Sequence, residues 1–197
     1  MRASNLTSAN LGCFHEAGDE SVTCADLSEA DLTRAKLMGV DFRGSDMRAS
    51  NLTSANLGCF HEAGDKSVTC ADLSEADLTG AFLRNTVLVG ADLTGVRLTG
   101  ADLELADLGC FYEAGDKRVT CADLSNTDLS NALLRNTVLV GADLTGALLA
   151  GADLRQARYN SKPIHTTDAF GRTHTLKPTK WPSGFDVSAT RAVCVDC

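Results

Sequence analysis

Eight cysteines are the most reactive side chains of this 197-residue sequence. Six of them bracket three similar segments of equal length, at 13–23, 59–69 and 110–120. The resulting pairs are Cys13/Cys24, Cys59/Cys70 and Cys110/Cys121. If each segment leaves and rejoins the fold at one place, its two cysteines meet the roughly 5.5–6 Å Cα separation of a disulfide. Disulfides are therefore the first expectation, and free thiols are the alternative.

A metal site is the other chemistry that the first segment could carry. Zinc accepts Cys13, His15, Cys24 and a carboxylate as ligands. The third segment argues against zinc, because Tyr112 stands where the other two segments have His, although both of its cysteines are kept. We therefore expect no metal and no cofactor.

The last two cysteines, Cys194 and Cys197, form a Cys-x-x-Cys motif at the end of the sequence. A redox motif of this type normally opens a helix within a βαβ unit, and no such unit is recognisable here. We expect a fourth disulfide or two free thiols. His165 and His174 are expected to be surface residues rather than ligands.

Carboxylates outnumber basic side chains by 26 to 18, which gives a formal charge of −8. That charge disfavours a protein that binds nucleic acid directly by neutralising phosphates. Paired carboxylates suit glycosidase chemistry only when two acids converge in a cleft. No Gly-rich phosphate loop or nucleophile elbow accompanies them. We therefore expect that the protein is not an enzyme.

Two observations about the cellular compartment of the protein conflict. No apolar run approaches the roughly 20 residues of a membrane span, and polar residues begin at Arg2, unlike a signal peptide. These features favour the cytoplasm slightly. Paired cysteines favour an oxidising compartment, so the periplasm or a thylakoid lumen follows if they are disulfides.

A five-residue repeat must position these side chains. Twenty-five units, centred from Leu6 to Tyr159, share a small residue, a frequent Asp or Asn, and a central Leu in 22 of them. A period of five fits neither a helix nor a strand, so we infer a turn at each unit. Four such turns make a coil of about 20 residues, and stacked coils pair like parallel strands roughly 4.8 Å apart.

The motif Ala-(Asp/Asn)-Leu-x-x resembles the pentapeptide-repeat family. The resemblance implies an all-β fold, a right-handed quadrilateral parallel β-helix, here of about six coils over residues 1–159. Relatives include cyanobacterial and plant lumenal proteins, and quinolone-resistance proteins that bind DNA gyrase. The resemblance implies a non-enzymatic scaffold that binds an unknown partner protein. The alternative is an acidic mimic of DNA that binds gyrase. By the same resemblance the source is a bacterium of cyanobacterial type.

Deleting any of the three Cys-bracketed segments restores the repeat without a gap, which predicts loops inserted at corners of the coil. Eight pentads separate the second loop from the third, so these two should project from one face, about 10 Å apart. An alternative places Val22, Val68 and Val119 inward in a distorted wall, with the cysteines further apart. The phenylalanines are loop anchors or exposed contacts. Candidate contact residues are Phe14, His15, Glu16, Phe60, His61, Glu62, Phe111, Tyr112 and Glu113.

The repeat stops near Tyr159, and residues 160–197 are expected to cap the open end of the coils. Trp181 and Phe185 are the natural lids, and 181–186 resembles C-terminal caps of cyanobacterial pentapeptide-repeat proteins. A short helix is expected from about Ser188 to Val193. The sequence starts within a repeat, so a second copy covering that end, as a homodimer, is a further hypothesis.

Overall fold

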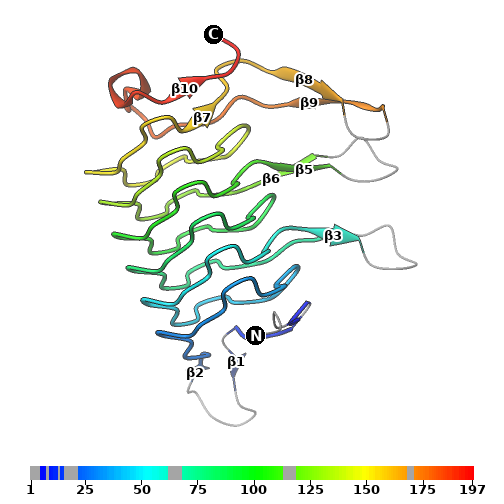
Figure 1. Ribbon diagram of the computed structural model, residues 1–197, viewed down its shortest axis with the longest axis vertical. Helices are drawn as coiled ribbons and strands as arrows, with labels where there is room; N and C mark the ends of the chain where they lie inside the picture. Colours follow the sequence, from blue (N-terminus) through cyan, green and yellow to red (C-terminus); the bar gives the residue numbers. More distant parts are fainter. Residues whose placement is uncertain are drawn as a thin grey trace.

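The computed structural model describes residues 5–7, 9–12, 14–15, 22–61, 68–112, 119–167 and 171–197, with the backbone alone for 14–15, 22–23 and 61. The described chain rises as a stack of turns joined by parallel β-bridges (Figure 1). The bridges join successive turns, as between Asp26 and Asp46, and reach across a Cys-bracketed segment where one intervenes, as between Asp41 and Asp72. No described helix is long and apolar enough to cross a membrane.

The bridges align the residues that precede each central Leu into four columns along the stack. Column 1 is Asn5, Lys36, Asn56, Val87, Asp107, Val138 and Arg158. Column 2 is Asn10, Asp41, Asp72, Asp92, Asp123, Asp143 and Lys180. Column 3 is Asp26, Asp46, Asp77, Arg97, Asp128 and Leu148, and column 4 is Asp31, Asn51, Phe82, Asp102, Leu133 and Asp153.

The pentads that carry Asp share one local geometry, which is set by their residue types. The Asp accepts a hydrogen bond from the backbone N–H two residues later, as Asp72 does from Ser74 at 3.0 Å. Such side-chain caps favour turns over longer regular structure. A residue in the left-handed region follows, for example Gly80 with φ +68°. The turn closes when the next small residue donates to the carbonyl of the central Leu, as Ala76 does to Leu73 at 3.0 Å.

The core is a column of central Leu side chains separated by small residues. Leu73, Leu98 and Leu124 have no exposed surface, and Ala76 and Ala101 are equally buried. A larger residue in place of these alanines would overpack the neighbouring turn. Burying each Leu contributes roughly 1.5–3 kcal/mol before chain entropy is subtracted.

Three antiparallel strand pairs occupy the Cys-bracketed segments. They are β1 (Phe14–His15) with β2 (Val22–Thr23), β3 (Phe60–His61) with β4 (Val68–Thr69), and β5 (Cys110–Tyr112) with β6 (Val119–Cys121). Disulfides join Cys59 to Cys70 and Cys110 to Cys121, each with Cα atoms 3.8 Å apart. The ends of these two segments therefore adjoin. Cys13 lies outside the described residues, so the pairing of Cys24 stays a prediction.

The C-terminal segment contains a hairpin that the sequence analysis did not predict. After β7 (Arg158–Tyr159), strands β8 (Ile164–Thr167) and β9 (Thr173–Leu176) pair antiparallel. The chain then rejoins the stack at Lys180, which forms a parallel β-bridge with Asp143 in column 2. This hairpin and those formed by β3/β4 and β5/β6 project from the same side of the stack (Figure 1).

The end of the stack is covered by aromatic residues and a short helix. Trp181 stacks on Phe185, with ring centroids 5.4 Å apart, and meets Tyr159 edge-on at 5.5 Å. The helix is a single 3-10 turn, Val187–Thr190, instead of the expected span from about 188 to 193. It ends early because Arg191 adopts a left-handed conformation. Strand β10 (Val193–Cys194) then pairs parallel with β7.

Candidate functional site

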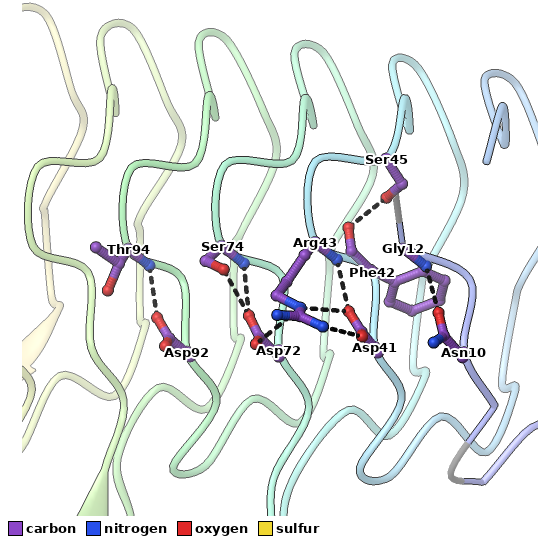
Figure 2. A network of polar contacts seen from close by, with 10 residues as sticks. All are labelled: Asn10, Gly12, Asp41, Phe42, Arg43, Ser45, Asp72, Ser74, Asp92 and Thr94. Carbon is purple, nitrogen blue, oxygen red and sulfur yellow. Dashed lines mark hydrogen bonds and ion pairs between the residues drawn. The ribbon is translucent and has the colours of Figure 1, made fainter. Parts of the chain in front are cut away.

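Column 2 carries five consecutive aspartates, which we call the Asp ladder: Asp41, Asp72, Asp92, Asp123 and Asp143. Figure 2 shows the first three, side by side on successive turns, each accepting a hydrogen bond from the backbone two residues later. Because parallel-paired residues lie roughly 4.8 Å apart, the ladder concentrates negative charge on one face.

Within the described chain, basic side chains form ion pairs with Asp41 and Asp72 at one end of the ladder and with Asp143 at the other. The guanidinium of Arg43 contacts Asp41 Oδ2 at 2.8 Å and Asp72 Oδ2 at 3.5 Å, and its hydrogen bond to Asp41 lowers the pKa of that carboxyl (Figure 2). At the other end Lys180 pairs with Asp143. Burial raises the pKa of Asp143, but hydrogen bonds from Lys180 and Thr145 outweigh it and lower the pKa.

The middle of the ladder makes no ion pair among the described residues, although the charge of Asp123 contributes, after the hydrogen bond and charge of Asp143, to raising the pKa of Lys180. Within the described chain, neither Asp92 nor Asp123 lies within ion-pair distance of a basic side chain. Both carboxylates keep the backbone hydrogen bond of their own turn, from Thr94 and Ser125, at 2.9 Å each. In the part of the chain that the structure describes, no hydrogen bond reaches the second oxygen of either carboxylate.

Columns 3 and 4 differ from column 2 because other residue types interrupt their runs of Asp and because several of their Asp side chains form ion pairs. Arg97 and Leu148 interrupt column 3, whereas Phe82 and Leu133 interrupt column 4. Asp pairs with Arg in both columns, and the hydrogen bond from Arg155 lowers the pKa of Asp153 to about 2. The pairs are Asp46–Arg48, Asp77–Arg97, Asp102–Arg84 and Asp153–Arg155. Asp26 and Asp128 in column 3 and Asp31 in column 4 make no ion pair within the described chain, so column 2 is distinguished by its unbroken run of five aspartates.

The hairpins rise from the corner where column 1 turns into column 2, directly before Asp72 and Asp123. Their bases pack on glycines of the neighbouring turns. A Cβ added at Gly90 would lie 2.5 Å from Cys59 Sγ and 3.1 Å from the Thr120 carbonyl oxygen. A Cβ added at Gly141 would likewise lie 2.5 Å from Cys110 Sγ. The hairpin bases are thus held against the stack beside the Asp ladder.

The predicted contact residues are only partly described. Phe60, Phe111 and Tyr112 are half-buried. The ring of Tyr112 lies 4.9 Å from that of His174, so hairpin β5/β6 contacts β9. The prediction that His174 is a surface residue is wrong, because it is 3% exposed. Only the backbone of Phe14, His15 and His61 is described, and Glu16, Glu62 and Glu113 lie outside the described residues.

Asn160 is a structural residue that the sequence analysis missed. It is fully buried at the neck of hairpin β8/β9, where disulfides close the other two described necks. Its Oδ1 accepts hydrogen bonds from the Gly141 N–H and from Thr179, and its Nδ2 donates to the carbonyls of Lys162 and Lys177. An Asn directly after the last aromatic repeat centre was the signal available in the sequence.

A polar hollow of about 390 Å³ lies where hairpin β5/β6, the ladder and the chain after β9 meet. Asp123, Asp143, Lys177 and Lys180 line it. Elsewhere, the one group of three possible metal ligands among the described residues is Cys194, Asp196 and Cys197, two of which form a disulfide. The Asp ladder is thus a charged surface, bordered at one end by this hollow.

The chain was compared with known proteins. The Pentapeptide repeats family profile matches residues 25–58, 71–109 and 120–158, with eight copies. No match was found among curated protein sequences. HetL, a pentapeptide repeat protein involved in heterocyst differentiation regulation in the cyanobacterium Nostoc sp. strain PCC 7120, is 30% identical with a TM-score of 0.51. The match covers 80% of this chain and 62% of HetL, so this chain spans less than two thirds of its length.

Two more distant structures have the same type of repeat. A pentapeptide repeat protein from the Arabidopsis thaliana thylakoid lumen is 23% identical, with a TM-score of 0.47, over 66% of this chain and 85% of that one. QnrB1, a plasmid-mediated fluoroquinolone resistance protein, is 19% identical, with a TM-score of 0.36, over 68% of this chain and 71% of its own. The family match, together with the parallel bridges, identifies the β-helix fold, and the chain belongs to the pentapeptide-repeat family.

Proposed function

We propose that this protein is a non-enzymatic scaffold that binds a partner protein through the Asp ladder and the hairpins beside it. The observation that carries the proposal is the unbroken run of five aspartates in column 2, of which Asp92 and Asp123 make no ion pair within the described chain. A partner that presents Lys or Arg at matching spacing would complete the ion pairs that Arg43 and Lys180 make at the ends. Complementary charge of this kind provides specificity and speeds association.

Catalysis is disfavoured by how the carboxylates are held. Each ladder Asp accepts a hydrogen bond from its own turn, as the recurring Asp–Ser and Asp–Thr contacts show. General acid–base pairs need two carboxyls that converge on one substrate, with one pKa raised. The ladder carboxyls instead follow one another along a straight face, and the two ladder pKa values described above are lowered.

We further propose that the β-helix is right-handed and quadrilateral, with about six coils over 1–159 and loops inserted at corners. Support comes from the four columns of bridges and, within residues 1–159, from their constant sequence spacing wherever no Cys-bracketed segment intervenes. In this arrangement 160–197 forms the capping segment. The Asp ladder then occupies one complete wall of the coil.

Binding of fluorescein-labelled octalysine, followed by fluorescence anisotropy at low salt, tests the interaction proposal. The double variant Asp92→Asn/Asp123→Asn should keep the fold, because Asn10 and Asn56 already make the same turn hydrogen bond. We expect about tenfold weaker binding. The control Asp102→Asn/Asp153→Asn removes equal charge from column 4 and should change affinity less than twofold. Equal losses in both variants would contradict a specific role for the ladder.

The second candidate function is an acidic mimic of DNA directed at gyrase. The net charge of −8 and the continuous ladder favour it. A DNA supercoiling assay separates the two candidates. Inhibition of gyrase that is lost in Asp92→Asn/Asp123→Asn supports the mimic, whereas no inhibition at micromolar protein excludes it.

A second copy of the chain is proposed as a partner at the N-terminal end. Residues 1–33 and 47–79 differ at one position, yet Leu6 and Leu27 are only half-buried, whereas their counterparts Leu52 and Leu73 are fully buried. Stacking of two such ends would bury the leucines. Sedimentation as a monomer at high concentration would refute it.

The compartment also stays a proposal. The disulfides favour the periplasm or a thylakoid lumen over the cytoplasm. Thiol labelling of protein from its native source, prepared without reductant, tests this. Resistance of the hairpin cysteines to labelling supports the oxidising compartment, and ready labelling supports the cytoplasm.

A further inference from the structure

The C-terminal Cys-x-x-Cys belongs to a clasp that the proposed function does not use. Cys194 and Cys197 form a disulfide. Inside this small ring, the carboxylate of Asp196 accepts hydrogen bonds from the backbone N–H groups of Ser161, at 2.8 Å, and Lys162, at 2.6 Å. These amides begin the connection from β7 to β8, so the ring ties the end of the chain to the end of the stack.

The strand that carries the clasp is short and lies at an edge. The backbone hydrogen bonds that attach β10 and its flanking residue to β7 include those from Val193 N to Ala157 O at 2.7 Å and from Val195 N to Tyr159 O at 2.8 Å. The side chains of Val193 and Val195 remain 40% and 38% exposed. Little apolar burial therefore holds β10, and the Asp196 contacts carry a large share of its attachment.

One cysteine of the clasp is more exposed than those of the two described hairpin disulfides. Cys197 is exposed, whereas Cys59 is 6% exposed and the other three cysteines of those two disulfides are half-buried, as Cys194 is. Cys59 Sγ and Cys110 Sγ face the next turn of the stack, 3.3 Å and 3.4 Å from the carbonyls of Val89 and Val140. Thiol–disulfide exchange requires a thiolate to reach one sulfur of the bond. Among the described disulfides, the clasp satisfies this requirement best.

Ring size favours opening of the same bond. The clasp joins residues three apart, whereas each hairpin disulfide joins residues 11 apart. In the chain-entropy account, a disulfide that closes a smaller ring stabilises the fold less. For these ring sizes the equilibrium constant for reduction of the clasp should be about fivefold larger than that of a hairpin disulfide. The clasp should therefore be reduced under conditions that leave the hairpin disulfides closed.

We propose that Cys194 and Cys197 form a thiol–disulfide exchange site, whose reduction by a dithiol releases β10 from the end of the stack. A thiolate of the dithiol attacks Cys197 Sγ and forms a mixed disulfide, while the Cys194 sulfur leaves and takes up a proton. The second thiol of the reductant then displaces Cys197. The reductant becomes a disulfide, and the chain gains two thiols.

The opened clasp has a hydrogen-bond acceptor in place for the Cys194 thiol. The Cys194 thiol can donate to Asp196 Oδ1, which lies 3.0 Å from its sulfur. No βαβ unit is needed, because the chain is the substrate of the exchange and not the oxidoreductase.

The first test titrates the full oxidised chain with dithiothreitol at graded ratios of reduced to oxidised reagent, followed by alkylation and peptide mass mapping. We expect half-reduction of the Cys194–Cys197 pair at a ratio at least fivefold lower than for Cys59–Cys70 or Cys110–Cys121. Simultaneous or later reduction of the clasp overturns the proposal. Alkylation of Cys194 and Cys197 before any reductant is added overturns it equally.

The second test measures amide hydrogen exchange. Reduction of the clasp should make the amides of Ser161, Lys162, Val193 and Val195 exchange about tenfold faster, with Leu98 as an unaffected control. The variant Cys194→Ser/Cys197→Ser should match the reduced chain. Asp196→Asn should speed exchange at Ser161 and Lys162 while the disulfide stays closed. Unchanged exchange at these four amides after reduction would show that the disulfide does not control β10.

Discussion

The packing of hairpin bases on glycine corners gives a sharp prediction for Gly90→Ala. Gly90 has φ +71°, and an added Cβ would meet Cys59 Sγ at 2.5 Å and the Thr120 carbonyl oxygen at 3.1 Å. Because one of these atoms is backbone and the other is fixed by a disulfide, neither can move aside easily. Gly100 is the matched control, since its φ is +67° and an added Cβ would have no neighbour within 4 Å.

Both substitutions place Ala in the left-handed region, which costs about 1–2 kcal/mol. The chain tolerates this conformation at Ala49, with φ 54°. Gly90→Ala carries an additional overpacking cost of about 1–3 kcal/mol. We therefore expect its free energy of unfolding to fall by about 3 kcal/mol, against about 1 kcal/mol for Gly100→Ala.

Guanidinium denaturation of both variants, with disulfides intact and m-values compared, measures the difference. Equal destabilisation by the two substitutions would refute the reasoning, because the hairpin base could not then be packed on this corner. The same result would remove the argument that the hairpins are held beside the Asp ladder.

Three further predictions concern buried polar groups and pH. Ser50→Ala should stabilise the fold by about 1 kcal/mol in the same denaturation assay, because Ser50 Oγ is buried without a hydrogen-bond partner. Ser45→Ala is the control and should not stabilise the fold, because Ser45 Oγ donates to the Phe42 carbonyl (Figure 2). A loss of stability in Ser50→Ala would contradict this. Asn160→Ala should destabilise by about 3 kcal/mol, because it leaves several buried backbone groups without partners; a loss below about 1 kcal/mol would show that the neck does not depend on the amide. The pKa of Asp153 is lowered from 3.8 to about 2 in the folded chain, so the stability it contributes is complete above its ordinary pKa and is lost as pH falls toward 2. The Tm of Asp153→Asn should therefore vary less between pH 4 and pH 2 than that of the unaltered chain, and parallel curves would contradict the assignment.

The five-residue period predicts much of this architecture, because each position of the pentad has one physical role. The Asp–Asp pairs that the period places one coil apart, such as Asp72 and Asp92, do bridge one another as the spacing indicates. The continuity of the ladder was harder to predict. It depends on longer steps, such as Asp92 to Asp123, which cross an insertion whose path had to be known first.

The C-terminal region was less predictable because its repeat signal is weak. A last pentad is present here, with Thr179 at the small position, Lys180 at the outward position and Trp181 at the central position. Because it contains neither Leu nor Asp, the repeat pattern is not recognisable in the sequence. Hairpin β8/β9 has no bracketing cysteines to reveal it. Its neck is closed by Asn160, whose hydrogen bonds join residues 17 to 19 positions apart, and composition does not indicate such contacts.

The most direct test of the ladder as a binding surface is a titration of the full chain with octalysine, followed by backbone amide NMR. Thr94 and Ser125 donate their amides to Asp92 and Asp123, so they report on the middle of the ladder. The amides of Glu104 and Ser130 make the same turn contact in columns 4 and 3. The account predicts saturable shifts at Thr94 and Ser125 that exceed those at Glu104 and Ser130. Shifts of equal size at all four amides would contradict it.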